Sequence, residues 1–256
     1  MNFSEIEVTL DGARAGITLN RPGKLNPLST TTLNELVEAA RWLDTRSGVK
    51  VVVISGRGRA FSAGADLASF ASEDGPPPRE AADAGRRMAE AIEAMRAVTV
   101  ARIHGHCVGG AVVLAAACDL RIAADDTRFS IPEVDLGIPL AWGGIPRLVR
   151  EIGPARTKEL VMTCRPFGAG EALTMGFLNR VVPASELDAT VDELVDQLLG
   201  KSALTLTATK RHTNAVTESM VGTARAWNDA DSLVTALADP ESQGAAQAYL
   251  KRLGRG

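Results

Sequence analysis

Cysteine is scarce in this sequence, which has three cysteines in 256 residues. They are Cys107, Cys118 and Cys164, and no two of them form a CxxC pair. An odd number of cysteines without metal-ligand spacing argues against a disulfide framework and against a zinc site. We therefore expect reduced thiols and a cytoplasmic protein.

Long apolar runs and an excess of positive charge are also missing. The longest apolar stretch, residues 108–118, is too short to cross a membrane, and residues 1–10 lack the apolar centre of a signal peptide. The formal net charge of −3 provides no overall field that would attract nucleic acid or an anionic membrane. We expect neither as a partner, and an anionic substrate would need local basic residues and helix N-termini.

The composition that remains is that of an ordinary globular protein. Apolar residues make up 45% of the chain and charged residues 23%, which is enough apolar material for a full core. A chain of 256 residues predicts one large domain, or one domain with a smaller appendage.

Strand and helix patterns alternate along the first 185 residues. Apolar and polar residues alternate on both sides of an Asp-Gly turn in residues 6–19, which predicts a β-hairpin. The other predicted strands are residues 49–54, 98–103 and 120–123, and the predicted helices are residues 30–43, 79–97 and 109–118. Alternating strands and helices predict an α/β fold with a mostly parallel sheet.

The pattern changes towards the C-terminus. Residues 72–79 (SEDGPPPR) can continue neither a helix nor a strand, so they predict a loop. After about residue 185 the strand pattern ends, and residues 186–199 and 203–253 predict helices. We expect an α/β core over residues 1–190 followed by a helical region over residues 191–256.

Two glycine-containing segments can supply backbone donors to an anion. Gly109 and Gly110 open an apolar helical run, so their N–H groups lack intrahelical acceptors and lie at the positive end of the helix dipole. The run Ala63-Gly64-Ala65 follows a predicted buried strand, at the predicted start of a helical turn. Two such donors can hold an oxyanion, and losing one costs about 3–4 kcal/mol of transition-state stabilisation. Each segment alone is more often a packing or turn device.

A series of motifs, in this order, carries a resemblance to a known family. The motifs are Arg21-Pro22, Asn26-Pro27-Leu28, AFSAGADL at 60–67, HGHCVGGA at 104–111, CDLRIAA at 118–124, PEVDLGI at 132–138 and WGGIPRL at 142–148. In this order they resemble the enoyl-CoA hydratase/isomerase (crotonase) family. The resemblance implies a crotonase-like (ClpP/crotonase) spiral of ββα units, with the acyl-CoA site in the core and a C-terminal α-helical region used for trimerisation. It also implies an acyl-CoA thioester as substrate, with coenzyme A as part of that substrate and no other cofactor or metal, and a homotrimer or a dimer of trimers.

The resemblance assigns roles to individual positions. The N–H groups of Ala65 and Gly110 correspond to the oxyanion hole, and Glu133, after Pro132, corresponds to a catalytic glutamate. Lys24 and Leu25 lie where the family often contacts the adenosine phosphate, although Lys24 is equally typical of a surface charge. The remaining substrate-binding positions are Ala63, Asp66, Leu67, Ala68, Val113, Pro132 and Ala141, of which Asp66 can instead be structural.

The sequence departs from the hydratase pattern at Val113. Hydratases of the family typically have a second glutamate there, and the two carboxylates position the water that adds to the double bond. Valine cannot ionise or transfer a proton, so Glu133 is left as the single acid/base group. This arrangement is similar to that of isomerases of fatty acid metabolism that convert 3-enoyl-CoA to 2-enoyl-CoA. Ala141, where hydratases often have glycine, favours a drier pocket.

Two alternatives remain open at this point. The protein can be a hydratase in which another residue, such as His104 or His106, replaces the missing glutamate. It can also be a non-catalytic acyl-CoA-binding protein. The HxH pair has no acidic or cysteine partner at metal-ligand spacing, so we do not expect a metal site there. Asp119, Trp142 and Trp227 are expected to be structural.

Overall fold

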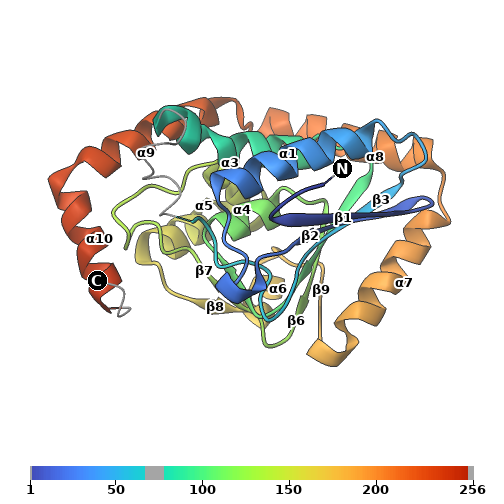
Figure 1. The fold of residues 1–256 in the computed structure, drawn as a ribbon, viewed down its shortest axis with the longest axis horizontal. Helices are drawn as coiled ribbons and strands as arrows, with labels where there is room; N and C mark the ends of the chain where they lie inside the picture. The colour runs from blue at the N-terminus through green and yellow to red at the C-terminus, as the bar shows by residue number, and fades with distance from the viewer. Residues whose placement is uncertain (1, 67–77, 253–256) are drawn as a thin grey trace.

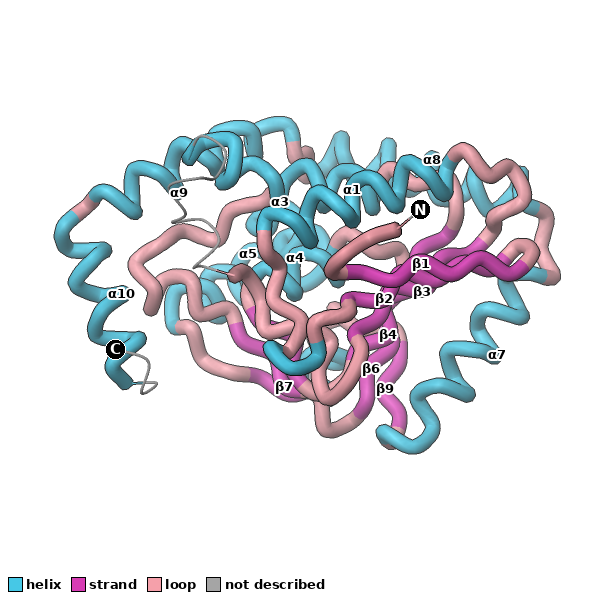
Figure 2. The backbone as a smooth tube through the Cα atoms, viewed as in Figure 1, coloured by secondary structure: helices cyan, strands magenta, loops and turns pink. Residues whose placement is uncertain are grey.

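A computed structural model of the chain describes residues 2–66 and 78–252. Its centre is a six-stranded sheet in the order β1-β2-β3-β4-β6-β9, with helices around it (Figures 1 and 2). The strands are β1 (Ile6–Asp11), β2 (Arg14–Leu19), β3 (Val51–Gly56), β4 (Val98–Ile103), β6 (Leu120–Ala124) and β9 (Arg180–Val182). A three-stranded sheet consists of β5 (His106–Val108), β7 (Arg128–Ser130) and β8 (Phe167–Gly168).

The predicted hairpin and the mostly parallel sheet are both confirmed. Strands β1 and β2 pair in antiparallel fashion up to Asp11 and Arg14, around a turn in which Gly12 has a φ of 55°. Every other pair of neighbours in the large sheet is parallel. Strands β3, β4 and β6 begin and end within two residues of the predicted limits, whereas β9 was not predicted.

The two faces of the large sheet contact different helices. Side chains alternate between the faces, so neighbouring residues such as Val52 and Val53 belong to different hydrophobic clusters. Helices α1 (Thr30–Asp44), α3 (Pro78–Glu93) and α4 (Gly110–Ala116) cover one face, and α7 (Leu187–Leu199) lies on the other (Figure 1). The boundary expected between residues 190 and 191 therefore falls inside α7, a helix that packs on the sheet.

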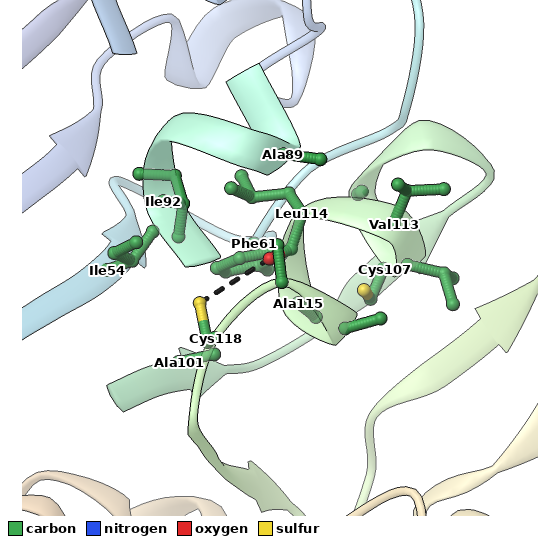
Figure 3. Close-up of a cluster of buried hydrophobic side chains, with 14 of the residues drawn as sticks. Ile54, Phe61, Ala89, Ile92, Ala101, Cys107, Val113, Leu114, Ala115 and Cys118 are labelled. Carbon is green, nitrogen blue, oxygen red and sulfur yellow. Dashed lines mark hydrogen bonds between the residues drawn. The ribbon is translucent and has the colours of Figure 1, made fainter. Parts of the chain in front are cut away.

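Helix α4 is enclosed on all sides, because each of its residues from Gly110 to Ala116 is buried. Leu114 points towards Ala89 and Ile92 of α3, whereas Val113 points away from them (Figure 3). After α4, the thiol of Cys118 donates to the carbonyl of Leu114. The first turn of α4 is thus held in a fixed place between the sheet and its neighbouring helices.

Helices α5 (Gly144–Thr163) and α6 (Ala169–Thr174) precede β9. Short 3-10 turns lie between β2 and α1, at η1 (Pro22–Lys24), and before α7, at η2 (Ala184–Glu186). Helix α5 bends at Gly153, which has a φ of 79° and precedes Pro154. A proline inside a helix lacks the N–H that would continue the hydrogen-bond ladder, and this explains the bend.

Residues 203–252 are mostly helical, as predicted for residues 203–253, but they form several helices instead of one. These are α8 (Ala203–Met220), η3 (Ala224–Asn228), α9 (Asp229–Ala238) and α10 (Pro240–Arg252). The division follows local chemistry, since Gly222 follows the end of α8 and Pro240 begins α10. Buried Lys210 ties α8 to the core through an ion pair of 2.8 Å with Asp119, which confirms a structural role for this aspartate.

All three cysteines are free thiols. Within residues 2–66 and 78–252, no helix combines the length and the apolar character needed to cross a membrane.

Candidate active site

Parallel pairing in the small sheet brings three separate segments to one edge. Strands β5 and β7 are parallel, with Cys107 opposite Phe129, and an isolated parallel bridge joins Ser62 to Cys107. The chain therefore leaves β5, β7 and the bridge at Ser62 at the same end, as in other open parallel sheets where sites form at the carboxyl ends of strands. The segments that leave there are residues 63–66, 109–110 and 131–133.

Gly109 and Gly110 occupy the predicted helix N-terminus, with Gly109 as the N-cap and Gly110 as the first residue of α4. Gly109 has φ 53° and ψ −117°, a conformation that glycine adopts and other L residues disfavour. A Cβ atom at Gly109 would also lie 2.4 Å from Oε1 of Glu133. Gly109 thus allows the backbone to turn and leaves room for the side chain of Glu133. Its N–H donates to the carbonyl of Ser130 at 2.9 Å.

The helical turn predicted to begin at residues 63–65 would continue into residues 67–77, which lie outside the described part of the chain, and Ala65 itself is extended. It forms an isolated parallel bridge with Leu28, whose N–H donates to the carbonyl of Gly64 and whose carbonyl accepts from the N–H of Asp66. In a parallel bridge of this kind the N–H of the middle residue points away from the partner strand. Gly64 (φ 87°) packs against the carbonyl of Val108. Extended pairing with Leu28, rather than a helix dipole, therefore orients the Ala65 N–H.

Ala65 and Gly110 both line one cavity. Within the described part of the chain, neither N–H group donates to an acceptor. Backbone donors beside an apolar cavity interact strongly with a negative charge, because little water competes for them. These two groups form the kind of donor pair that can stabilise an oxyanion.

Glu133 is a buried carboxyl group with little polar support. Its residue exposure is 8%, and its Oε2 atom has no hydrogen-bond partner among the described residues. Burial raises the pKa of Glu133 from 4.5 to about 7, and a hydrogen bond from its own backbone opposes this shift. A carboxyl group with a pKa near neutrality can both accept and return a proton.

The cavity has a volume of about 370 Å³ and mostly apolar walls. It is lined by Ala65, Ala82, Gly110, Val113, Glu133, Leu136, Ile138, Pro139, Leu140, Ala141, Trp142, Leu233, Leu237, Ala246 and Leu250. Among these lining residues Glu133 is the only one with an ionisable side chain. The site can therefore hold an apolar group next to one carboxyl group and two backbone donors.

Comparison of the sequence with known proteins identifies the family to which the chain belongs. The sequence profile of the enoyl-CoA hydratase/isomerase family matches residues 11–254. The chain belongs to the enoyl-CoA hydratase/isomerase family. It is 34% identical to a crotonyl-CoA hydratase of Syntrophomonas wolfei over 215 residues, 84% of this chain and 83% of the relative. It is 35% identical to a peroxisomal Delta(3,5)-Delta(2,4)-dienoyl-CoA isomerase of Arabidopsis thaliana over 242 residues, 88% of this chain and 87% of the relative.

The solved structures agree with the expected fold class. An enoyl-CoA hydratase from Mycobacterium avium subsp. paratuberculosis superposes with a TM-score of 0.89 at 29% identity, over 96% of this chain and 99% of that one. The crotonase-like α/β fold with a C-terminal helical region is thereby confirmed. As a member of this family, the protein is an enzyme of the lyase or isomerase type.

Only some of the predicted site residues line the cavity. Ala65, Gly110, Val113, Glu133 and Ala141 line it. The predicted positions that do not line it are Lys24, Leu25, Ala63, Asp66 and Pro132, and Leu67 and Ala68 lie outside the described residues.

Two of the positions outside the cavity have a clear structural setting. Lys24 is exposed at the end of η1. Asp66 pairs with Arg21 at 3.2 Å, and Arg21 also lies 3.3 Å from Glu5. The Arg21–Asp66 ion pair fixes the strand segment that follows Ala65.

Neither histidine of the HxH pair lines the cavity. His106 is exposed, and His104 is half-buried with Nε2 2.8 Å from the Gly58 carbonyl and Nδ1 3.0 Å from Nη1 of Arg102. Arginine can only donate and a carbonyl can only accept, so this histidine is neutral with its proton on Nε2. The pKa of His104 is lowered, mainly by burial, and the positive charge of nearby Arg102 lowers it further.

His104 belongs to a separate groove of about 660 Å³ that is lined by residues of β1, β2, β3 and β4 and of α7. The charged groups of this groove pair with one another, as in Arg14 with Asp192 and Arg102 with Asp188. The groove contains neither Glu133 nor the two backbone donors. Across the described residues, no group of three or more His, Cys, Asp or Glu side chains is arranged to hold a metal ion.

The sequence reasoning missed much of the apolar wall. Leu136, Ile138, Pro139 and Leu140 follow Glu133 directly, so the apolar run after the PE motif was an available signal. Four residues from the C-terminal helices were not foreseeable from their distance along the chain. Leu233 and Leu237 of α9, and Ala246 and Leu250 of α10, each lie four residues apart, which places each pair on one helix face.

Proposed function

We propose that the protein is an acyl-CoA isomerase that moves a double bond from the 3 to the 2 position, with Glu133 as its single acid/base group. The observation that carries the proposal is that Glu133 is the one ionisable side chain among the described residues of an otherwise apolar cavity. The curated relatives include hydratases and an isomerase of CoA thioesters, which supports an acyl-CoA substrate. Coenzyme A is part of that substrate, and the proposed reaction needs no further cofactor.

The proposed reaction transfers one proton in two steps. The carboxylate of Glu133 removes a proton from C2 of a 3-enoyl thioester, and the electron pair of the C2–H bond moves into a dienolate. The N–H groups of Ala65 and Gly110 donate to the thioester oxygen, on which the negative charge develops. The protonated Glu133 then returns the proton to C4, the double bond forms between C2 and C3, and the carboxylate is regenerated.

The pKa of Glu133 is suited to both steps. With a pKa raised to about 7 by burial, about half of the carboxyl groups are ionised at neutral pH. The ionised form is a stronger base than an exposed carboxylate, and the protonated form is still acidic enough to return the proton. An apolar wall also keeps water away from the dienolate between the two steps.

The surroundings of Val113 support isomerisation over hydration. Val113 is fully buried in the cavity wall one turn after Gly110, and a Cβ atom on Gly144 would lie 2.9 Å from its Cγ2 atom. No described side chain in the cavity replaces the second carboxylate, since His104 and His106 lie elsewhere. Hydration needs a positioned water with two polar partners, and this apolar wall offers only Glu133.

The test is a comparison of two substrates on purified protein. We expect 3-enoyl-CoA to be converted with a rise in the absorbance of the conjugated thioester, and 2-enoyl-CoA to form no 3-hydroxyacyl-CoA. Formation of 3-hydroxyacyl-CoA from 2-enoyl-CoA, detected by mass spectrometry as the addition of one water, would show hydration and refute the proposal. A 3,5-dienoyl-CoA belongs in the same panel, because removal of a proton from C2 and its return to C6 would move both double bonds to the 2,4 positions.

Binding without turnover is the remaining outcome of that panel. If no substrate reacts, calorimetric titration with a saturated acyl-CoA tests whether the cavity still binds a thioester. Binding with no reaction would favour the non-catalytic reading and refute Glu133 as a catalytic group.

We also propose that the protein assembles as a homotrimer or a dimer of trimers through its C-terminal helices. Helix α8 presents three large apolar side chains to solvent, with exposed fractions of 78% for Leu204, 61% for Val216 and 77% for Met220. Apolar side chains gathered on one helix are typical of interaction surfaces. Light scattering should give three or six times the mass of one chain, and a monomer would contradict the proposal.

A further inference from the structure

The turn before α5 has an unusual backbone that carries a cavity residue. Trp142 and Gly143 both have positive φ, at 63° and 68°. Glycine tolerates this region, but a bulky L residue such as tryptophan disfavours it. Such a conformation persists only where the surrounding structure holds it, and it is concentrated at functional sites.

The indole of Trp142 is packed between two glycines that have no room for a side chain. A Cβ atom on Gly85 of α3 would lie 1.9 Å from Cδ2 of the ring, and one on Gly110 would lie 2.2 Å from Cζ3. Helices α3 and α4 both contact this ring, through Gly85 and Gly110. Trp142 therefore covers the backbone of Gly110, whose N–H is one of the two proposed oxyanion donors.

Arg147 holds the turn from the inside of the protein. It is fully buried, and its Nη1 atom donates to the carbonyls of Trp142 and Gly143, each at 3.2 Å. Its Nη2 atom pairs with Oε2 of Glu93 at 2.5 Å. The planar guanidinium can serve the carboxylate and both carbonyls at once because its donors form a rigid fork.

The C-terminal helices complete this support. The N–H of Gly143 donates to Asp229, the first residue of α9, at 2.7 Å. Arg150 pairs with the other oxygen of Glu93 at 2.6 Å and with Glu218 of α8. Arg150 shares the ion-pair network of Arg147, but no contact joins it to the Trp142–Gly143 turn in the described structure.

We propose that Arg147 is a positioning residue that fixes the Trp142–Gly143 turn, so that the indole shields the Gly110 N–H from water. This proposal rests on the proposed function for the role of Gly110. Without the guanidinium, the turn relaxes from its positive φ and the ring withdraws from Gly110. Water then enters beside the donor and competes with the thioester oxygen for its hydrogen bond.

The test compares Arg147→Met with Arg150→Met, since each removes one arginine from Glu93 and only the first removes contacts to the turn. For Arg147→Met we expect kcat for 3-enoyl-CoA to fall about 10- to 100-fold, with KM within about threefold, as for a displacement of about 1 Å near reacting groups. For Arg150→Met we expect kcat within about threefold of the wild type. Equal losses in both variants would show that the ion-pair network matters only for folding, and would overturn the proposal.

A spectroscopic readout separates this proposal from the reaction itself. Acrylamide quenching of Trp142 fluorescence, taken as the difference between each protein and its Trp142→Phe counterpart, should increase at least about twofold in Arg147→Met and stay unchanged in Arg150→Met. Unchanged quenching in Arg147→Met overturns the positioning role even if kcat falls. If the wild type does not isomerise any substrate, the proposed function fails while the quenching result still decides the role of Arg147.

A milder variant and a double-mutant cycle protect the test against misfolding. Arg147→Lys keeps the charge beside Glu93 but lacks the fork, so quenching should still rise and kcat should still fall, each by less than in Arg147→Met. Because both residues act through the same ring, Trp142→Phe combined with Arg147→Met should lose less activity than the product of the single losses. Wild-type quenching and kcat in Arg147→Lys, or independent losses in the cycle, would contradict the proposal.

Discussion

Replacing Glu133 with glutamine should stabilise the folded protein, and increasingly so as the pH rises. Burial raises the pKa of this carboxyl group from 4.5 to about 7. One pKa unit corresponds to about 1.4 kcal/mol, so the full shift disfavours the folded state by about 3 kcal/mol once the group is ionised in both states.

The pH window follows from the direction of the shift. Because the pKa is higher in the folded state, that state binds the proton more tightly than the unfolded chain. The stability that the protonated carboxyl group contributes is fully present below about pH 4.5 and is lost as the pH rises to about 7. Glutamine never ionises, so the advantage of Glu133→Gln should grow by about 2 kcal/mol between about pH 5.5 and about pH 8.5.

The assay is urea denaturation of both proteins at the two pH values, with the free energy of unfolding extrapolated to water. Glu38→Gln on the exposed face of α1 is the matched control, since it makes the same chemical change in contact with solvent. Its effect should be independent of pH. If the free energies of unfolding of Glu133→Gln and wild type differ by an amount that changes by less than about 0.5 kcal/mol across this pH range, the pKa of Glu133 is not raised by burial as described here.

Three further predictions follow from the same structure. Val113→Glu should raise hydration of 2-enoyl-CoA at least about tenfold over wild type, whereas Val113→Gln should not, because only the carboxyl group can transfer a proton; no gain would mean that more of the cavity wall opposes hydration. The kcat/KM for isomerisation should fall about tenfold per pH unit below about pH 6 and level off above about pH 7, since Glu133 must be ionised to accept a proton; a flat profile from about pH 5.5 to 8 would contradict this. Lys210→Met should lower the free energy of unfolding by about 3 kcal/mol, because it leaves Asp119 without its buried ion-pair partner, with kcat of the folded enzyme unchanged; a loss under about 1 kcal/mol in urea denaturation would show that water replaces the pair.

The sequence predicts the parts of the fold that local patterns determine. The Asp-Gly hairpin, the buried strands and the N-terminus of α4 at Gly110 all depend on spacing within about ten residues. The extended pairing of Ala65 was not predicted, because its partner, Leu28, is 37 positions earlier in the chain. An isolated bridge between distant residues leaves no periodic pattern, so only the folded structure shows how that N–H is oriented.

The site follows the same division between local and distant contacts. Glu133 and Gly110 could be identified from motifs, but the carboxyl group's lack of a hydrogen-bond partner depends on what packs around it. The apolar wall formed by Leu233 and Leu250 comes from helices about 100 residues after Glu133. Trp142 was expected to be a packing residue, and its position over Gly110 depends on a backbone conformation that no composition signal indicates.

The central claim is that one carboxyl group, Glu133, moves the proton. The most direct measurement is kcat/KM of Glu133→Gln for 3-enoyl-CoA, together with the dissociation constant of a saturated acyl-CoA thioester. We predict a loss of at least about 10³-fold in kcat/KM, within the range for removal of a general acid–base group, with thioester binding within a few-fold of wild type. Activity retained in Glu133→Gln, or binding lost together with activity, would contradict the account.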